Sequence, residues 1–414
     1  MKVYLATFGC RANQYDSEAV RAMLRSGGCE LASSAAGADV AIFNSCTVTA
    51  RAEADLRQSV RRAARTNPAL RTVVMGCAAA VDDGSLASLP SVTHVVPGAD
   101  VPAIAAALEL PAAATLLSTS TQTGARALLR IQDGCDEHCT FCLTTIARGT
   151  SRSRAPDELV GEATALAEHH PEIVLTGIHI GGWGADLPAP RSLGWLLERL
   201  VRALPGVRFR LSSIEATEVD ATLGRLLTGE PERVAPHLHA PLQSGSDRVL
   251  RRMGRHWYTA SRYAAAVEAI AGRGSVFALG ADVIAGFPGE TERDHRQTVA
   301  LLGSLPVTYL HVFPYSPRPG TGAARLPGRL PPAVVSERAA ELRDLGRTQA
   351  ERYRASRHGG TADVVLTAGG TRREGLTEDY LTVVPRDQQL PRGARVRATL
   401  ELDGATLYAR QTIR

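Results

Sequence analysis

The sequence predicts an α/β protein in three parts: an N-terminal doubly wound parallel sheet, a central partial (β/α)6 barrel and a small C-terminal antiparallel β-barrel. Short apolar runs alternate with helical patterns through the first part, and the same alternation recurs through the second. The third part carries short strand patterns separated by glycine-containing turns. We expect domains over residues 1–117, 125–330 and 359–414, with a connecting helix over residues 331–358.

The N-terminal part has the pattern of a parallel sheet, because strands that alternate with helices cross over between neighbours. The stretch that follows it, Pro111–Gly124, lacks periodicity and is typical of a linker. Strands are predicted over Lys2–Thr7, Asp39–Asn44, Arg71–Gly76 and Thr93–Val96, with helical patterns near Ser17–Arg25 and Glu53–Arg65.

The central part repeats a strand-and-helix unit. Six strands predict a partial barrel, shorter than the closed form with eight, and its chemistry is expected at the carboxyl ends of the strands. The predicted strands are Ala127–Ile131, Ile173–Thr176, Arg208–Leu211, His237–Leu242, Phe277–Ile284 and Tyr309–Phe313. The predicted helices are Pro156–Glu168, Leu193–Leu204, Val219–Leu227, Ala260–Ala271 and Thr291–Leu305.

The C-terminal part opens with an Arg- and Glu-rich helical pattern, Ala333–Arg357. Glycine pairs and Asp-Gly steps then mark turns, here Gly369-Gly370 and Asp403-Gly404. The strand patterns between them predict the small barrel. These strands are Ala362–Leu366, Tyr380–Val384, Val396–Leu402 and Thr406–Ile413.

Composition narrows the class of protein and of partner. The chain of 414 residues is 44% hydrophobic and 21% charged, enough for two or three cores, because single domains stop growing near about 250–300 residues. No apolar stretch reaches the roughly 18–20 residues that cross a bilayer, so we expect a cytoplasmic protein with no membrane partner. A net charge of +5 permits an anionic partner without requiring one.

Seven cysteines, an odd number, favour metal or cluster ligation over a disulfide framework. Cys135, Cys139 and Cys142 form a C-x3-C-x2-C run directly after the first predicted barrel strand. Three thiolates this close together hold three irons of a cubane cluster and leave the fourth iron open. Two alternatives remain: a structural zinc site with His138 as fourth ligand, or three inert buried cysteines.

A second set of cysteines lies in the N-terminal part. Cys10, Cys46 and Cys77 follow the first three predicted strands. Because the carboxyl ends of parallel strands lie at one edge of a sheet, we expect these thiols to converge and hold a second cluster. The alternative is three unrelated buried cysteines, which are common in apolar cores. Cys29 fits neither set, and we interpret it as structural.

The cysteine run, with the aromatic Phe141 inside it, resembles the signature of the radical S-adenosylmethionine superfamily. Together with other segments it resembles the methylthiotransferase family along nearly the whole chain, most closely the branch acting on threonylcarbamoyladenosine in tRNA. The C-terminal part is similar, over Gly375–Val383, to the TRAM domain, an RNA-binding barrel. The segments that resemble the family are Thr7–Glu18, Asn44–Thr49, Ile131–Asp136, Leu175–His179, Pro241–Asp247, Asp282–Thr291 and His311–Thr321.

This resemblance implies a chemistry. One S-adenosylmethionine donates a methyl group to sulfur held at a 4Fe–4S cluster on Cys10, Cys46 and Cys77. A second becomes the radical source at a 4Fe–4S cluster on the catalytic Cys135, Cys139 and Cys142. The methylthio group is then joined to carbon 2 of the adenine ring. The partners implied are tRNA and an electron donor such as flavodoxin or ferredoxin, and not DNA.

Contacts to S-adenosylmethionine are implied at the strand ends of the barrel. The resemblance assigns the methionine amine to Thr176 and Gly177, the ribose to Ser213 and Gln243, and the adenine to the segment from Gly286 to Glu290. Phe141 is expected to contribute from the cysteine run. Arg148 and Arg152, just past that run, are expected to meet a carboxylate or phosphate, or to remain solvated. In the C-terminal barrel, Arg372, Arg373, Arg395 and Arg397 are candidates for phosphate contacts.

One segment departs from the family pattern: Leu143–Gly149 lacks the proline and the aromatic that relatives usually carry there. Two alternatives to the tRNA assignment therefore stay open. The same chemistry could act on another acceptor, namely isopentenyladenosine in tRNA, a ribosomal-protein aspartate or a small molecule. In the other class, the chain would be a non-catalytic iron–sulfur RNA-binding protein.

Overall fold

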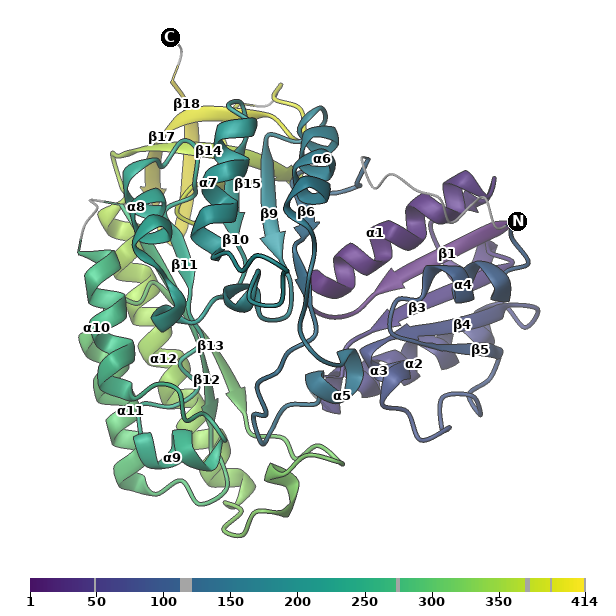
Figure 1. The fold of residues 1–414 in the computed structure, drawn as a ribbon, viewed down its shortest axis with the longest axis horizontal. Helices are drawn as coiled ribbons and strands as arrows, with labels where there is room; N and C mark the ends of the chain where they lie inside the picture. Colours follow the sequence, from purple (N-terminus) through teal and green to yellow (C-terminus); the bar gives the residue numbers. More distant parts are fainter. Residues whose placement is uncertain (48–49, 112–120, 273–275, 369–372, 388, 413–414) are drawn as a thin grey trace. The chain divides into compact units, whose positions relative to one another are not determined.

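The computed structural model of the chain describes residues 1–47, 50–111, 121–272, 276–368, 373–387 and 389–412. These residues form two compact units, each described by itself below (Figure 1). Unit 1 comprises residues 1–123, 132–152 and 316–324, and unit 2 comprises residues 124–131, 153–315 and 325–414. The cysteine run thus belongs to the same unit as the N-terminal sheet. No helix among the described residues is long and apolar enough to cross a membrane.

Unit 1 is built on a five-stranded parallel sheet with the order β2-β1-β3-β4-β5, which confirms the predicted doubly wound sheet. Its strands are β1 (Lys2–Thr7), β2 (Glu30–Leu31), β3 (Val40–Ser45), β4 (Arg71–Gly76) and β5 (Val92–Pro97). Its helices are α1 (Arg11–Ser26), α2 (Ala50–Thr66), α3 (Cys77–Ala80), α4 (Val101–Ala107) and α5 (Thr144–Arg148), with a short 3-10 turn at Ala35–Gly37.

Apolar side chains cover both faces of this sheet. Successive strand residues point to opposite faces, so Val40 and Ile42 pack with α1 and α4, while Ala41 and Phe43 pack with α2. All six residues of β3 are buried. With both faces covered by helices, the ends of the strands are the places left for a ligand.

Unit 2 contains six parallel strands in two three-stranded sheets, β10-β9-β6 and β11-β12-β13, joined by isolated bridges between Phe209 and Val234 and between Ser213 and His239. The order confirms the predicted partial barrel. Its strands are β6 (Ala127–Arg130), β9 (Glu172–Thr176), β10 (Arg208–Leu211), β11 (His237–His239), β12 (Ala278–Ala285) and β13 (Tyr309–Pro314). The short strands β7 (Gln132–Asp133) and β8 (Arg152–Ser153) flank the cysteine run in the sequence.

The helices of unit 2 match the predicted ones to within a few residues. Several short elements had not been predicted, among them the helix α9 and the 3-10 turns at Ile180–Gly182 and Ala216–Glu218. The helices are α6 (Pro156–Ala167), α7 (Leu193–Ala203), α8 (Ala221–Gly229), α9 (Asp247–Arg252), α10 (Ala260–Ala271), α11 (Glu292–Ser304) and α12 (Pro332–Ser356), with a further 3-10 turn at Ala323–Arg325.

A closed five-stranded barrel ends the chain, with the order β14-β15-β16-β18-β17. The predicted small barrel is confirmed, although one of its described strand pairs, β16 with β18, is parallel. The predicted turn at Gly369-Gly370 lies outside the described residues. The strands are β14 (Thr361–Ala368), β15 (Glu374–Thr377), β16 (Thr382–Pro385), β17 (Arg395–Asp403) and β18 (Thr406–Gln411).

A buried ionic cluster joins the partial barrel to this C-terminal barrel within unit 2. The Glu172 carboxylate accepts hydrogen bonds from Arg208 (2.6 Å) and Arg210 (2.9 Å), and all three side chains are fully buried. Arg208 also donates to the Asp363 carbonyl (2.8 Å), and Arg210 to the Thr377 carbonyl (2.9 Å). Burial alone would raise the pKa of Glu172, but the arginines hold it well below its ordinary value. Buried ion pairs therefore link the partial barrel to the C-terminal barrel, in addition to packing.

Candidate functional site

The first cysteine set lies where three strands of unit 1 end. Cys10, Cys46 and Cys77 directly follow β1, β3 and β4. Gly9 has φ of +129°, and a Cβ built on it would lie 2.5 Å from the Cβ of Cys46, so the loops after β1 and β3 touch. Cys10 also lies close enough to Cys77 to act on it electrostatically. The three loops therefore meet at one edge of the sheet, as the strand order requires.

Two buried asparagines lock these loops together. Asn13 donates to the Asn44 side-chain oxygen (3.0 Å), and Asn44 donates back to the Asn13 carbonyl (2.7 Å). The Cys10 thiol lies 3.3 Å from the Asn13 side-chain oxygen. Reasoning from the sequence missed the role of both asparagines, although each lies in a segment that carries the family resemblance. Polar side chains without periodic spacing give no hydrophobic signal.

The second cysteine set forms a loop held by backbone hydrogen bonds. The backbone N–H of Glu137 donates to the Cys135 sulfur (3.4 Å) and that of Thr144 to the Cys142 sulfur (3.3 Å). Hydrogen bonds to the cysteine sulfurs are among the features that tune an iron–sulfur cluster. Gly134 has φ of +73°, and a Cβ there would overlap the Thr150 carbonyl, so a side chain is excluded at this turn.

The spacing of the cysteine sulfurs does not suit a single zinc ion. Tetrahedral zinc with bonds of about 2.3 Å holds its sulfur ligands about 3.8 Å apart. Among the described residues, the only Cys, His, Asp or Glu group of three or more with ligand atoms within 4.8 Å of one another is elsewhere, in unit 2. His138, the candidate fourth ligand, is exposed, whereas Phe141 is half-buried in the run. A cubane spreads its thiolates over separate irons, and the loop is compatible with that wider spacing.

Arg148 connects the two cysteine sets inside unit 1. Its Nε donates to the Cys77 sulfur (3.1 Å), one terminal nitrogen to Asp16 (2.7 Å) and the other to Asp133 (3.2 Å). The side chain is 4% exposed. Burial alone would lower the pKa of the guanidinium, but Asp16, Cys77 and Asp133 raise it above its ordinary value. The arginine expected to meet a carboxylate or phosphate thus meets two carboxylates and a thiol.

A second contact ties the cysteine run to the segment 316–324. The Ala323 N–H donates to the Thr140 carbonyl (2.7 Å). In the same segment the buried Arg318 pairs with Glu53 and donates to Thr47 (2.8 Å), in the loop after Cys46. Segments far apart in the sequence therefore form one compact cysteine-bearing unit.

The residues proposed for S-adenosylmethionine lie at one edge of unit 2. Thr176 and Gly177 end β9, Ser213 follows β10, and Gln243 follows β11. Gln243 adopts φ of +66°, a left-handed conformation that a side chain rarely takes and that is enriched at functional sites. The Thr176 hydroxyl is buried, and no described residue gives it a hydrogen-bond partner. An unsatisfied hydroxyl beside a strained residue is compatible with a polar ligand at this edge.

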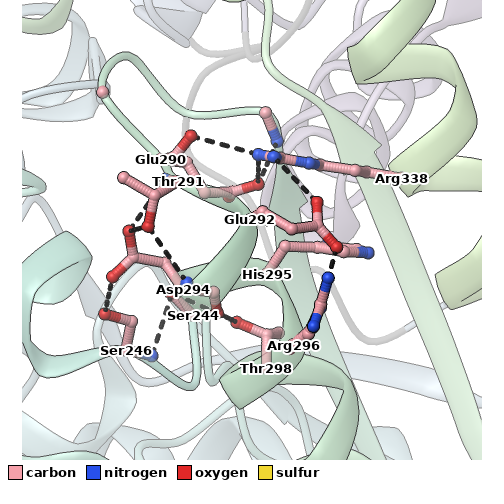
Figure 2. Close-up of polar contacts among 12 residues, drawn as sticks. Ser244, Ser246, Glu290, Thr291, Glu292, Asp294, His295, Arg296, Thr298 and Arg338 are labelled. Atoms are coloured by element: carbon pink, nitrogen blue, oxygen red, sulfur yellow. Dashed lines mark hydrogen bonds and ion pairs between the residues drawn. The ribbon is translucent and has the colours of Figure 1, made fainter.

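Glu290 is already engaged by the protein. Figure 2 shows its carboxylate beside Arg338, which donates to it over 2.7 Å, and it also accepts from the Gly286 N–H at 3.3 Å. Burial raises the pKa of Glu290, and Arg338 opposes that shift. Next to it, Thr291 and Asp294 form a reciprocal cap on α11. The carboxylate thus shapes the Gly286–Glu290 turn, and the backbone of the turn is the part left for a ligand.

Two arginines of the C-terminal barrel that were predicted to contact phosphate, Arg395 and Arg397, form ion pairs with carboxylates of the protein instead. Arg395 binds Asp363 through its Nε (2.9 Å) and a terminal nitrogen. Arg397 pairs with Glu232. Arg372 lies outside the described residues. Arginines that are neutralised by the protein's own carboxylates contribute less to binding a phosphate backbone.

Two family models match the chain. One, described as an uncharacterized protein family, UPF0004, matches residues 2–98. The other, the Radical SAM superfamily, matches residues 129–302. Cys10, Cys46 and Cys77 fall in the first range, and Cys135, Cys139 and Cys142 in the second.

Curated relatives match over most of the chain. A threonylcarbamoyladenosine tRNA methylthiotransferase MtaB from Rickettsia prowazekii is 35% identical, over 84% of this chain and 84% of its own. MtaB from Aquifex aeolicus is 33% identical, over 92% of this chain and 96% of its own. A tRNA-2-methylthio-N(6)-dimethylallyladenosine synthase from Parafrankia sp. is 33% identical, over 90% and 79%. The solved radical S-adenosylmethionine methyltransferase TsrM from Kitasatospora setae shares the fold, with a TM-score of 0.54 at 14% identity, over 75% of this chain and 72% of that one.

Proposed function

Because the chain belongs to the radical S-adenosylmethionine methylthiotransferases, a family of transferase enzymes, we propose that it methylthiolates carbon 2 of threonylcarbamoyladenosine next to the anticodon of tRNA. The observation that carries the proposal is the gathering of two three-cysteine sets in one compact unit, linked by Arg148. One set alone would support radical chemistry without a sulfur donor. Relatives named for threonylcarbamoyladenosine support the acceptor.

Cys135, Cys139 and Cys142 would hold the cluster that supplies the electron for cleaving S-adenosylmethionine. The N–H groups of Glu137 and Thr144 donate hydrogen bonds to the sulfurs of Cys135 and Cys142. Three cysteines leave one iron for the cofactor. The buried Thr176 hydroxyl and the strained Gln243, together with Gly177, Ser213 and the backbone of Gly286–Glu290, would bind S-adenosylmethionine at the strand ends of unit 2. Phe141 would line the cofactor from the cysteine run.

Cys10, Cys46 and Cys77 would hold the second 4Fe–4S cluster, which provides the site for sulfur transfer. The Asn13 and Asn44 pair fixes the loops that carry the first two cysteines. Arg148 donates to the Cys77 sulfur and brings positive charge to a buried anionic site. Such hydrogen bonds tune the potential of a cluster without altering its ligands.

The partners proposed are tRNA and an electron donor such as flavodoxin or ferredoxin, in the cytoplasm. The C-terminal barrel would bind RNA through groups other than Arg395 and Arg397, since both are paired with carboxylates. Ile146, in the segment that departs from the family pattern, is 58% exposed.

The test is mass spectrometry of nucleosides from bulk tRNA of host cells with and without this gene. Loss of the methylthio form of threonylcarbamoyladenosine on deletion is the expected result. Loss of the methylthio form of isopentenyladenosine instead would reassign the acceptor within tRNA. If all methylthio nucleosides persist while the purified protein still produces 5′-deoxyadenosine, the acceptor is a protein or a small molecule.

The non-catalytic alternative predicts a different result. A chain that only binds RNA would yield no 5′-deoxyadenosine under reducing, anaerobic conditions, even with intact clusters. That outcome would reject every enzymatic assignment made above.

A further inference from the structure

Three side chains in the partial barrel of unit 2 form a compact ligand set. His239 of β11, Asp282 of β12 and His311 of β13 place one nitrogen or oxygen atom each within 4.8 Å of the others. The His239 Nε2 lies 3.0 Å from Asp282 Oδ1, and the His311 Nδ1 lies 3.2 Å from the same oxygen. Among the described residues no other group meets this criterion. Nothing in the proposed radical chemistry uses it.

The parallel strand register places these side chains beside one another. Asp282 is paired with His311, and His239 with Gly280, so the three project from neighbouring strands of one sheet. On β13 the residue before His311 is Leu310, which packs against Gly346 of α12. Because strand residues alternate between faces, His311 lies on the face that α12 leaves uncovered. The set is thus fixed by backbone pairing rather than by a loop.

A second layer of side chains orients His239. Its Nδ1 lies 3.0 Å from the Tyr309 hydroxyl, which lies 2.7 Å from the His237 Nε2. A Cβ on Gly280 would overlap the Tyr309 ring, so the glycine makes room for this tyrosine. Histidines that bind a metal usually donate their other N–H to such a partner, which fixes the tautomer. The Asp282 carboxylate can only accept, so Nε2 of His239 donates to it, and the Tyr309 hydroxyl beside Nδ1 can accept the ring proton when the Nε2 lone pair is given to an ion instead.

The charge balance of the set favours a cation. Among the described residues, the ion-pair partners of Asp282 are the two histidines, and imidazole and carboxylate together are ligand types for a divalent cation. The Asp282 side chain is 21% exposed and His239 is 8% exposed. A negative charge so largely removed from water is costly unless a positive charge compensates it.

We propose that His239, Asp282 and His311 bind one Zn²⁺ ion. Two imidazoles and one carboxylate are the ligand types of a zinc site that keeps its fourth position open for water or a substrate oxygen. Tetrahedral zinc with bonds of about 2.0–2.1 Å holds neighbouring ligands about 3.3–3.4 Å apart, so the separations of 3.0 Å and 3.2 Å need to widen by only a few tenths of an ångström. His311 is 55% exposed, so the ion can reach the set from solvent.

The experiment measures zinc in the full chain, purified anaerobically after cluster assembly and equilibrated with buffered Zn²⁺. Elemental analysis should find one zinc per chain beyond the iron of the clusters. His311→Ala, a change at an exposed side chain, should abolish this zinc at unchanged iron content. Tyr309→Phe should weaken zinc affinity on the order of ten- to a hundred-fold, because it removes the partner that orients His239.

The matched control is His295→Ala, which removes a histidine that pairs with a single carboxylate, Glu341, and has no third ligand. It should leave zinc content unchanged. Zinc that stays in the His311→Ala protein, or no zinc bound by the wild-type protein in excess Zn²⁺, would overturn the proposal. Either result leaves the radical chemistry intact, because that depends on the cysteine sets and is read from 5′-deoxyadenosine.

Discussion

The two units differ in where their polar and titratable side chains lie relative to the strands. In unit 1, apolar side chains cover both faces of the sheet, and the reactive cysteines follow the strand ends. In unit 2, the strands themselves carry charged and titratable residues, such as Glu172 on β9 and Asp282 on β12. In unit 1 the buried polar side chain of Asn44 lies near the carboxyl end of β3, where it pairs with Asn13. In unit 2 the curved sheet of the partial barrel carries buried polar side chains along its strands, and these must pair with one another.

Each unit has both capped and uncapped helix starts: Asp100 caps α4 in unit 1, and α6 in unit 2 begins without a side-chain cap. In unit 2, Ser192, Asp220, Thr259 and Thr291 cap their helices with side-chain oxygens. In unit 1, the residue at the N-cap of α1 is Cys10, and its side chain makes no capping hydrogen bond. Under the proposed assignment of Cys10 to a cluster, unit 1 gives up a stabilising cap at the position of a ligand. This is the kind of stability sacrifice expected of a functional site.

The largest expected effect separates the two cysteine sets. Replacing Cys135, Cys139 and Cys142 with Ala should abolish 5′-deoxyadenosine formation, because the open iron would be lost. Replacing Cys10, Cys46 and Cys77 with Ala should remove about half the iron while 5′-deoxyadenosine formation persists. Iron analysis and product chromatography provide the two readings. Unchanged iron in the second variant would reject the second cluster.

Cys29→Ser is the matched control for both triple variants. Cys29 packs against the apolar cluster beside α1, away from both sets, and burial raises the pKa of its thiol. A half-buried thiol with a raised pKa gives less of the thiolate form that binds iron. The substitution should leave both iron content and 5′-deoxyadenosine formation unchanged.

The next effect concerns the buried charges of unit 2. Glu172→Gln leaves Arg208 and Arg210 buried without their carboxylate and should cost about 3–5 kcal/mol of unfolding free energy. All three tryptophans lie in unit 2, so their fluorescence during urea unfolding reports on this unit. Glu198→Gln, which breaks a partly exposed surface pair with Arg225, should stay within about 0.5 kcal/mol. Equal losses for the two variants would contradict the role given to burial.

The difference in unfolding free energy between wild type and Glu172→Gln should change with pH in one direction. The arginines hold the pKa of Glu172 below its ordinary value, so the folded state favours the ionised form. The resulting stability is fully present above about pH 4.3, the ordinary pKa of a glutamate. It is lost as the pH falls through the lower pKa of the folded state. The gap between wild type and Glu172→Gln should therefore narrow below about pH 4.3 and stay constant above it.

A smaller effect is expected at the link between the cysteine sets. Arg148→Lys keeps a positive charge near Cys77 but cannot donate to Cys77, Asp16 and Asp133 at once. We expect a lower reduction potential for the second cluster, because a hydrogen bond to its sulfur is weakened. An anaerobic redox titration followed by electron paramagnetic resonance measures this directly. Arg152→Lys, four residues on, should leave the potential unchanged.

The sequence predicted best what periodicity and spacing encode. The six strands of the partial barrel and the position of each cysteine after its strand are confirmed. The start of α1 at Arg11 was missed by six residues, because its first turns bury polar groups such as Asn13 and Asp16 instead of an apolar stripe. Strand β11 ends at His239 rather than Leu242, ahead of the strained Gln243.

Side-chain partnerships between distant segments could not be predicted. Arg148 pairs with Asp16 across 132 positions of sequence, and no local pattern encodes that pairing. The same holds for His239, Asp282 and His311, which lie in three strands far apart in the sequence. Their proximity follows from strand register, which is set by the whole barrel.

The smallest expected effect is on stability and concerns Cys10, which occupies the N-cap position of α1. In protein without clusters, Cys10→Ser places a strong capping side chain at the start of α1 and should raise the unfolding free energy of unit 1 by up to about 1 kcal/mol relative to Cys10→Ala. Circular dichroism during denaturation measures the difference. Thr291→Ala, at the cap of α11, should lose a similar amount. If the Cys10→Ser and Cys10→Ala proteins have equal unfolding free energies, a capping side chain brings no stability at this position. The missing cap of α1 would then cost the protein nothing.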